Sequence, residues 1–92
     1  MLNKKQIMDM IIEIDLKIDS EIERVNNGKS KKNIYQLNTI KKDLSRMKKF
    51  EDINIIYTRF ITDSWEHTDA LGNELIELES IYIKFLKKKS MH

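Results

Sequence analysis

Cysteine and proline are absent from this chain of 92 residues, and glycine occurs at two positions. Without cysteine the chain can form neither a disulfide framework nor a thiolate metal site, so nothing in it depends on an oxidising compartment. Proline and glycine are the residues that most often interrupt helices, and their scarcity favours helices joined by short turns. The composition therefore points to an all-helical protein.

Long apolar runs are missing as well. A membrane-spanning helix needs roughly eighteen apolar residues, whereas the apolar residues near the N-terminus are interrupted by Asp9, Glu13 and Asp15. The pattern predicts neither a secretory signal nor membrane insertion, and we expect a cytoplasmic protein. The length predicts one domain over residues 1–92, and 40% apolar content is enough to build its core.

Apolar residues recur at steps of three and four through residues 3–26, as they do in an amphipathic helix. Asn3 can cap the start of this helix. Asn26-Asn27-Gly28 can end it, because Asn and Gly accept the left-handed conformation found after helices. A second helix is predicted from Ser30, as its N-cap, to about Lys49. The short loop between the two makes them antiparallel neighbours.

The second half of the chain is harder to divide. Three-four spacing continues to Phe85, so one helix over Ile53–Lys88 is allowed. However, Ser64 and Thr68 place polar groups on the seam that such a helix would bury. Asp63-Ser64-Trp65-Glu66 also has the form of a capping box, in which an N-cap residue pairs with an acid three positions later.

We therefore favour a break near Thr62–Ser64. The segment Ile53–Ile61 would be a short helix or an irregular connector, and Ser64–Lys88 would be the last long helix. The fold prediction is all-α: an antiparallel bundle of three long helices with a possible short fourth helix. The predicted core consists of Ile11, Ile14, Ile18, Ile22, Leu37, Ile40, Leu44, Met47, Leu71, Leu75, Leu78 and Tyr82.

The apolar face of the first helix is broad, because Ile7-Met8-Ile11-Ile12 places apolar groups over more of the helix than a three-helix core can cover. Uncovered apolar patches mark interfaces. We therefore expect that the chain can form a homodimer.

Charges are sorted along the chain, although the net charge is +2. Between Lys29 and Lys49, Asp43 is the sole acid among eight basic residues: Lys29, Lys31, Lys32, Lys41, Lys42, Arg46, Lys48 and Lys49. Between Glu51 and Glu79 the balance inverts, and Arg59 is the one Lys or Arg among eight acids: Glu51, Asp52, Asp63, Glu66, Asp69, Glu74, Glu77 and Glu79. The two segments can pair with each other or offer oppositely charged surfaces to partners.

Asp63, Glu66, His67 and Asp69 resemble a carboxylate–histidine cluster. A metal site needs three or four converging ligands, and metal-binding bundles repeat Glu-x-x-His on several helices. This chain has one internal histidine and no second copy of that motif. A capped helix start with a solvated acidic face is the simpler interpretation. Since no nucleophile motif or phosphate-binding loop is present either, the sequence predicts no catalytic residue, no metal, no cofactor and no enzyme.

Two surfaces are candidates for binding. The first is acidic and aromatic: Trp65, the single tryptophan, lies near Tyr57 within the acidic segment, and an aromatic anchor ringed by charges is typical of a protein-binding hot spot. Its predicted partner-binding residues are Tyr57, Asp63, Trp65, Glu66, Asp69, Glu74 and Glu77. The alternative is a basic surface that would bind nucleic acid or another anionic surface through Lys31, Lys32, Lys41, Lys42, Lys48 and Lys49. Pairing of these lysines with the acids of Glu51–Glu79 would argue against that alternative.

The runs Arg59-Phe60-Ile61-Thr62-Asp63-Ser64-Trp65 and Leu71-Gly72-Asn73-Glu74-Leu75-Ile76-Glu77-Leu78, followed by Tyr82, resemble a pattern in small proteins of low-GC Gram-positive bacteria. Some of those proteins are similar to immunity proteins that accompany polymorphic toxins. The resemblance covers roughly the C-terminal third of the chain and carries no catalytic residue. It implies a protein that neutralises a toxin by covering its active site, and an acidic face suits a basic partner.

Overall fold

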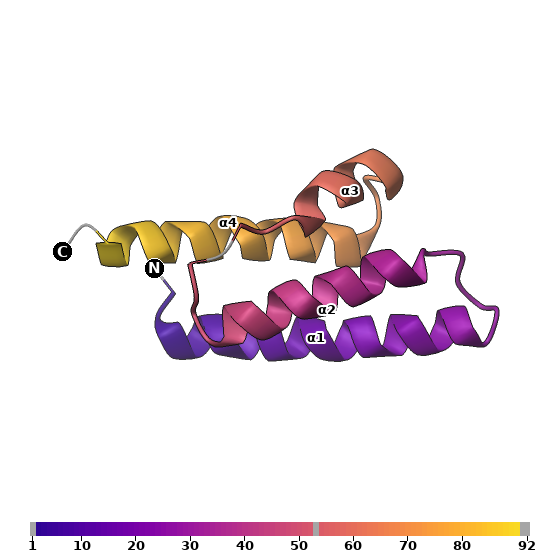
Figure 1. Ribbon diagram of the computed structural model, residues 1–92, viewed down its shortest axis with the longest axis horizontal. Coiled ribbons are helices and arrows are strands. Elements are labelled where there is room, and N and C mark those ends of the chain that lie inside the picture. Colours follow the sequence, from indigo (N-terminus) through magenta and orange to yellow (C-terminus); the bar gives the residue numbers. More distant parts are fainter. Residues whose placement is uncertain (1, 53, 91–92) are drawn as a thin grey trace.

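The computed structural model describes residues 2–52 and 54–90, and within them the chain forms four helices and no strand: α1 (Lys4–Asn26), α2 (Ile34–Lys48), α3 (Tyr57–Ser64) and α4 (Ala70–Ser90). Figure 1 shows the three long helices lying along a common direction, with the short α3 standing out beside the start of α4. Both α2 and α4 pack on α1 and run antiparallel to it (Figure 1). The predicted all-α bundle with a short fourth helix is confirmed.

The predicted boundaries of α1 are confirmed as well. The Asn3 side chain accepts a hydrogen bond from the Gln6 N–H at 2.8 Å, and the Gln6 side chain accepts one from the Asn3 N–H at 2.9 Å. This reciprocal pair satisfies two backbone donors that every helix start leaves unpaired. Gly28 follows the helix with φ +73°, a conformation in which a Cβ is strained. Glycine at position 28 therefore lets the chain turn back toward α2.

The predicted start of α2 is wrong by three residues. Asn33, not Ser30, is the N-cap, and its side-chain oxygen accepts hydrogen bonds from the backbone N–H groups of Tyr35 (2.8 Å) and Gln36 (3.2 Å). The Ser30 hydroxyl instead donates to a Glu21 carboxylate oxygen at 2.8 Å. Asn and Ser cap helices about equally well. The contact of Ser30 with α1 therefore decides which residue caps α2.

The predicted break in the second half exists but lies farther along the chain. Asp63 and Ser64 are still helical, and the chain leaves α3 at Trp65. Asp69 caps α4, because its side chain accepts a hydrogen bond from the Gly72 N–H at 3.0 Å. Thus the proposed Asp63–Glu66 capping box is wrong, and the last helix begins at Ala70 rather than Ser64. The connector's predicted first residue, Ile53, lies outside the described residues.

The core lies where the three long helices meet. Ten of the twelve predicted core residues are buried, while Ile22 and Leu71 are half-buried at its edge. Ile7, Tyr57 and Ile61 complete the buried set. Tyr57 and Ile61 belong to α3, which shows that the short helix covers the core rather than merely connecting its neighbours.

One charged side chain, Asp43, is buried among the described residues. Its carboxylate accepts a hydrogen bond from the backbone N–H of Ile56 at 3.1 Å. The contact ties the segment that leads into α3 against α2. A buried carboxylate is tolerated when hydrogen bonds replace its lost hydration.

Candidate partner-binding surface

Trp65 occupies the junction of α3 and α4. Its indole N–H donates to the Gln36 side-chain oxygen at 3.1 Å, and the Lys32 ammonium lies 4.9 Å from the ring centroid. A Cβ built on Gly72 would lie 3.1 Å from the ring carbon Cε3 and 3.2 Å from Cγ2 of Ile61. The groups that approach Gly72 most closely are therefore side chains. The half-buried indole ring is thus fixed by its contacts with Gln36, Lys32 and Gly72.

An ion pair closes this junction. The Lys32 ammonium lies 2.7 Å from an Asp69 carboxylate oxygen and 3.5 Å from one of Glu21. Burial by itself would raise the pKa of the Asp69 carboxyl, but hydrogen bonds from Lys32 and the Gly72 N–H outweigh burial, so the pKa lies below its ordinary value. Asp69 is therefore a structural group, fully engaged by α4 and the loop before α2.

Tyr57 is buried rather than exposed. Its hydroxyl donates to the Leu75 carbonyl oxygen at 2.8 Å, and burial raises the pKa of the hydroxyl above its ordinary value. The prediction that Tyr57 could anchor a partner is wrong, because a partner could reach it only after α3 left the core. Its role is to fix α3 on α4.

The remaining predicted acids lie in two places. Asp63 and Glu66 are exposed beside Trp65 and form no ion pair within the described part of the chain. Glu74 and Glu77 line a groove of about 160 Å³ that also contacts α1. In that groove Glu74 pairs with Lys17 at 2.8 Å, whereas Glu77 is exposed and forms no ion pair with any residue that the structure describes.

The seven predicted residues therefore do not form one patch. Within residues 2–52 and 54–90, no three acidic, histidine or cysteine side chains could hold a metal ion together. The cluster of Asp63, Glu66, His67 and Asp69 is dispersed, because Asp63 lies in the last turn of α3 while Asp69 caps α4. We define the acidic surface as Asp63 and Glu66 with the exposed part of Trp65.

The predicted basic surface is divided as well. Lys41 and Lys48 each donate a hydrogen bond to Asp15 of α1, at 3.1 and 2.6 Å, and Lys41 also pairs with Asp19. Burial would raise the pKa of the Asp15 carboxyl, but the two ammonium groups outweigh burial and lower it. These lysines thus stabilise the packing of α2 on α1.

Lys32 is the one member of the six that pairs with the acidic segment Glu51–Glu79 within the described residues. The sequence allowed pairing between the basic and acidic segments, but α1 supplies the partners of Lys41 and Lys48. The other three members of the predicted basic surface are exposed and form no ion pair in the described part of the chain: Lys31, Lys42 and Lys49.

The broad apolar face of α1 has a buried part and a partly exposed part. Ile7 and Ile11 are fully buried, whereas Ile12 and Leu16 are 44% and 63% exposed, and Met8 is half-buried. We call Met8, Ile12 and Leu16 the outer stripe of α1. None of the helices described has the length and apolar character required to cross a membrane.

Comparisons of the chain with protein-family models, curated proteins and solved structures found no match. Function must therefore be inferred from the surfaces themselves.

Proposed function

We propose that this protein is a non-catalytic protein-binding module that inhibits a bacterial toxin, as an immunity protein or antitoxin does. One observation carries the proposal: Asp63 and Glu66 are exposed and form no ion pair in the described part of the chain, whereas half of the candidate basic surface is neutralised within the molecule. Free acidic charge is available for a basic partner, and the resemblance to immunity proteins suggests which class of partner that is.

Charge and rigidity give this surface two properties of a binding site. Asp63 and Glu66 would attract a basic surface during diffusional encounter and raise the association rate. Trp65 is already fixed by Gln36 and Gly72, so binding would not have to order it. A prefixed aromatic edge flanked by unpaired acids suits the cationic active-site surface of a nuclease toxin.

Capture of partners from the native cell tests the proposal. The wild-type chain is expected to recover a protein partner, identified by mass spectrometry. The double variant Asp63→Lys/Glu66→Lys is expected to lose it, because each substitution replaces attraction by repulsion. Both positions are exposed, so the variant should keep the wild-type circular dichroism spectrum.

The matched control is Asp9→Lys/Glu23→Lys. It makes the same charge change at exposed acids of α1 that form no ion pair in the described part of the chain. The control should retain the partner. Recovery of nucleic acid alone, or equal recovery by both double variants, would count against the inhibitor proposal.

The basic surface is the alternative binding site, and three exposed lysines favour it: Lys31, Lys42 and Lys49. It predicts nucleic-acid affinity that falls steeply with added salt and depends little on base sequence. Fluorescence anisotropy with a short duplex at low ionic strength measures it, with the triple Lys→Gln variant of these positions as the comparison. Absence of binding by the wild type removes this alternative.

A further inference from the structure

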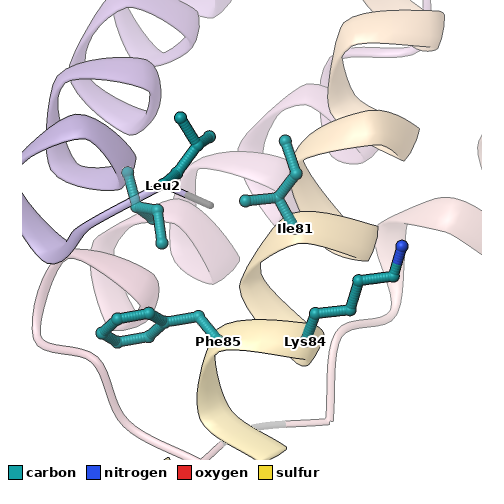
Figure 2. A pocket seen from close by; sticks show the side chains of 5 residues that line it. Leu2, Ile81, Lys84 and Phe85 are labelled. Carbon is teal, nitrogen blue, oxygen red and sulfur yellow. The ribbon is translucent and has the colours of Figure 1, made fainter. Parts of the chain in front are cut away.

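An apolar pocket lies between the start of α1 and the C-terminal half of α4. Its volume is about 320 Å³, and its lining residues are Leu2, Ile7, Ile81, Lys84 and Phe85. Figure 2 shows Leu2 and Ile81 facing the same space, with the Phe85 ring to one side and Lys84 extending in the opposite direction. The start of α1 and the end of α4 lie at this end of the bundle, and α3 lies at the other (Figure 1). The pocket is thus independent of the acidic surface.

Packing among the aromatic rings of Phe50, Tyr82 and Phe85 fixes Phe85 in the lining of the pocket. The Phe85 ring packs against Phe50 with 5.5 Å between centroids, and Phe50 stacks on Tyr82 at 6.0 Å. Phe50 has φ +54°, an uncommon conformation for a residue with a side chain. The Tyr82 hydroxyl in turn donates to the Glu51 carbonyl oxygen. These contacts hold Phe85 aside, and they explain why its ring does not fill the pocket.

The ionisable charge in the described lining of the pocket is positive. Lys84 is the sole ionisable residue of the lining, and no ion pair engages it within residues 2–52 and 54–90. The ammonium of Lys4 adds a second positive charge behind the wall, 4.9 Å from the Phe50 ring centroid. An apolar interior beside an exposed cation complements a molecule with an alkyl chain and an anionic end.

We propose that this pocket binds a single-chain fatty acid. The alkyl chain would lie among Leu2, Ile7, Ile81 and Phe85, and the carboxylate would lie at the rim, within reach of the flexible Lys84 side chain. An apolar cavity of about 150 Å³ holds a benzene molecule, so a pocket of this size accommodates roughly ten to twelve carbon atoms. Decanoate is therefore the appropriate probe.

The full protein chain is titrated with decanoate and with decylammonium in a calorimeter. The two probes have the same alkyl chain and opposite charges, so the comparison separates the contribution of the alkyl chain to affinity from that of the charge. Both probes are used below the concentrations at which they form micelles. Saturable one-to-one binding is expected, with decanoate bound more tightly than decylammonium. Lys84→Glu should weaken decanoate about fivefold to tenfold and reverse the order of the two probes, because attraction at the rim becomes repulsion. Lys29→Glu, at an exposed lysine of the loop after α1, should change neither affinity.

A second pair of variants tests the pocket itself. Ile81→Trp places an indole ring in the pocket and should weaken the affinity for decanoate at least tenfold. Ile83→Trp adds the same bulk at an exposed position of α4 and is the control. Should Ile81→Trp fail to fold, the Lys84→Glu comparison decides alone. Non-saturable uptake, equal binding of the two probes, or binding to anionic phospholipid vesicles without one-to-one binding of decanoate would each overturn the proposal.

Discussion

Asp69 joins α4 to the loop before α2 through one side chain. It caps α4, pairs with Lys32 in the loop before α2, and precedes the helical turn in which Gly72 meets the Trp65 ring. Asp63, the residue that the sequence had suggested for this role, is exposed at the end of α3. Asp63 and Asp69 thus have similar capping ability. They differ because the fold brings a charged partner, Lys32, to Asp69.

Replacing each aspartate by alanine measures this difference. Asp69→Ala is expected to lower the free energy of unfolding by about 1–2 kcal/mol, because an N-cap hydrogen bond is lost and Lys32 loses its partner. Asp63→Ala should change it by less than about 0.5 kcal/mol, as exposed substitutions usually do. Urea denaturation followed by circular dichroism provides both values. Equal losses would mean that Asp69 is not the cap that stabilises α4.

Acid should destabilise the protein through Asp15 and Asp69. Their pKa values lie below the ordinary 3.8 in the folded chain, so the folded state binds these protons more weakly than the unfolded state does. Their stabilising contribution is therefore present above the unfolded pKa and is lost as the pH falls through the folded pKa. The free energy of unfolding should decrease as the pH is lowered from about 5 to about 3.

The double variant Asp15→Asn/Asp69→Asn should show a flatter dependence over the same range, since asparagine retains the capping oxygen but binds no proton. Asp63→Asn is the control, and its pH profile should match that of the wild type. A double variant as acid-sensitive as the wild type would assign the pH dependence to other carboxyls.

At the scale of the helices, stability should follow the buried side of each one. Ile18 of α1 and Leu75 of α4 are fully buried, so truncating either to alanine is expected to cost about 2–5 kcal/mol. Leu16 lies two residues from Ile18 but is 63% exposed, and Leu16→Ala should cost less than about 0.5 kcal/mol. Urea midpoints of the three variants provide the comparison. A large loss of stability from Leu16→Ala would mean that α1 is rotated about its axis so that Leu16 faces the core.

Helical periodicity was sufficient to predict the first two helices, because burial repeats every three or four residues whatever lies opposite. It did not determine the start of α4, since both aspartates precede residues that can be helical. Packing of Trp65 on Gly72 favours the later start, and that contact spans α3 and α4. The ends of helices depend on tertiary contacts that the local sequence does not contain.

The candidate site was less predictable than the fold for the same reason. The sequence placed Asp63, Trp65 and Glu66 at the surface, where the structure also has them at least in part, but Tyr57 was wrongly assigned to the same surface. The apolar spacing that joins Tyr57 to Ile61 was the available signal for its burial. The pairing of Lys41 with Asp15 depends on the rotation of α2 against α1, which no single helix specifies.

The whole molecule is elongated, with principal extents of 48 × 23 × 20 Å, and α1 lies along one edge of it (Figure 1). The sides of α1 that contact α2 and α4 are covered, whereas the outer stripe of Met8, Ile12 and Leu16 leaves apolar surface uncovered. A second copy of the chain could cover this stripe with its own, since twofold pairing brings the same surface of both molecules together.

Self-association through this stripe is therefore expected at high protein concentration. Sedimentation equilibrium should give a mass above that of the monomer for the wild type, and Ile12→Lys/Leu16→Lys should restore the monomer, because charged side chains resist burial without partners. The double variant should still fold, since Ile12 and Leu16 are 44% and 63% exposed and belong to the uncovered side of α1. Ile56→Lys is the control, because it places the same charge at an exposed apolar residue outside the stripe and should leave the mass unchanged. A wild-type chain that stays monomeric at the highest concentrations would show that the outer stripe does not bind a second copy.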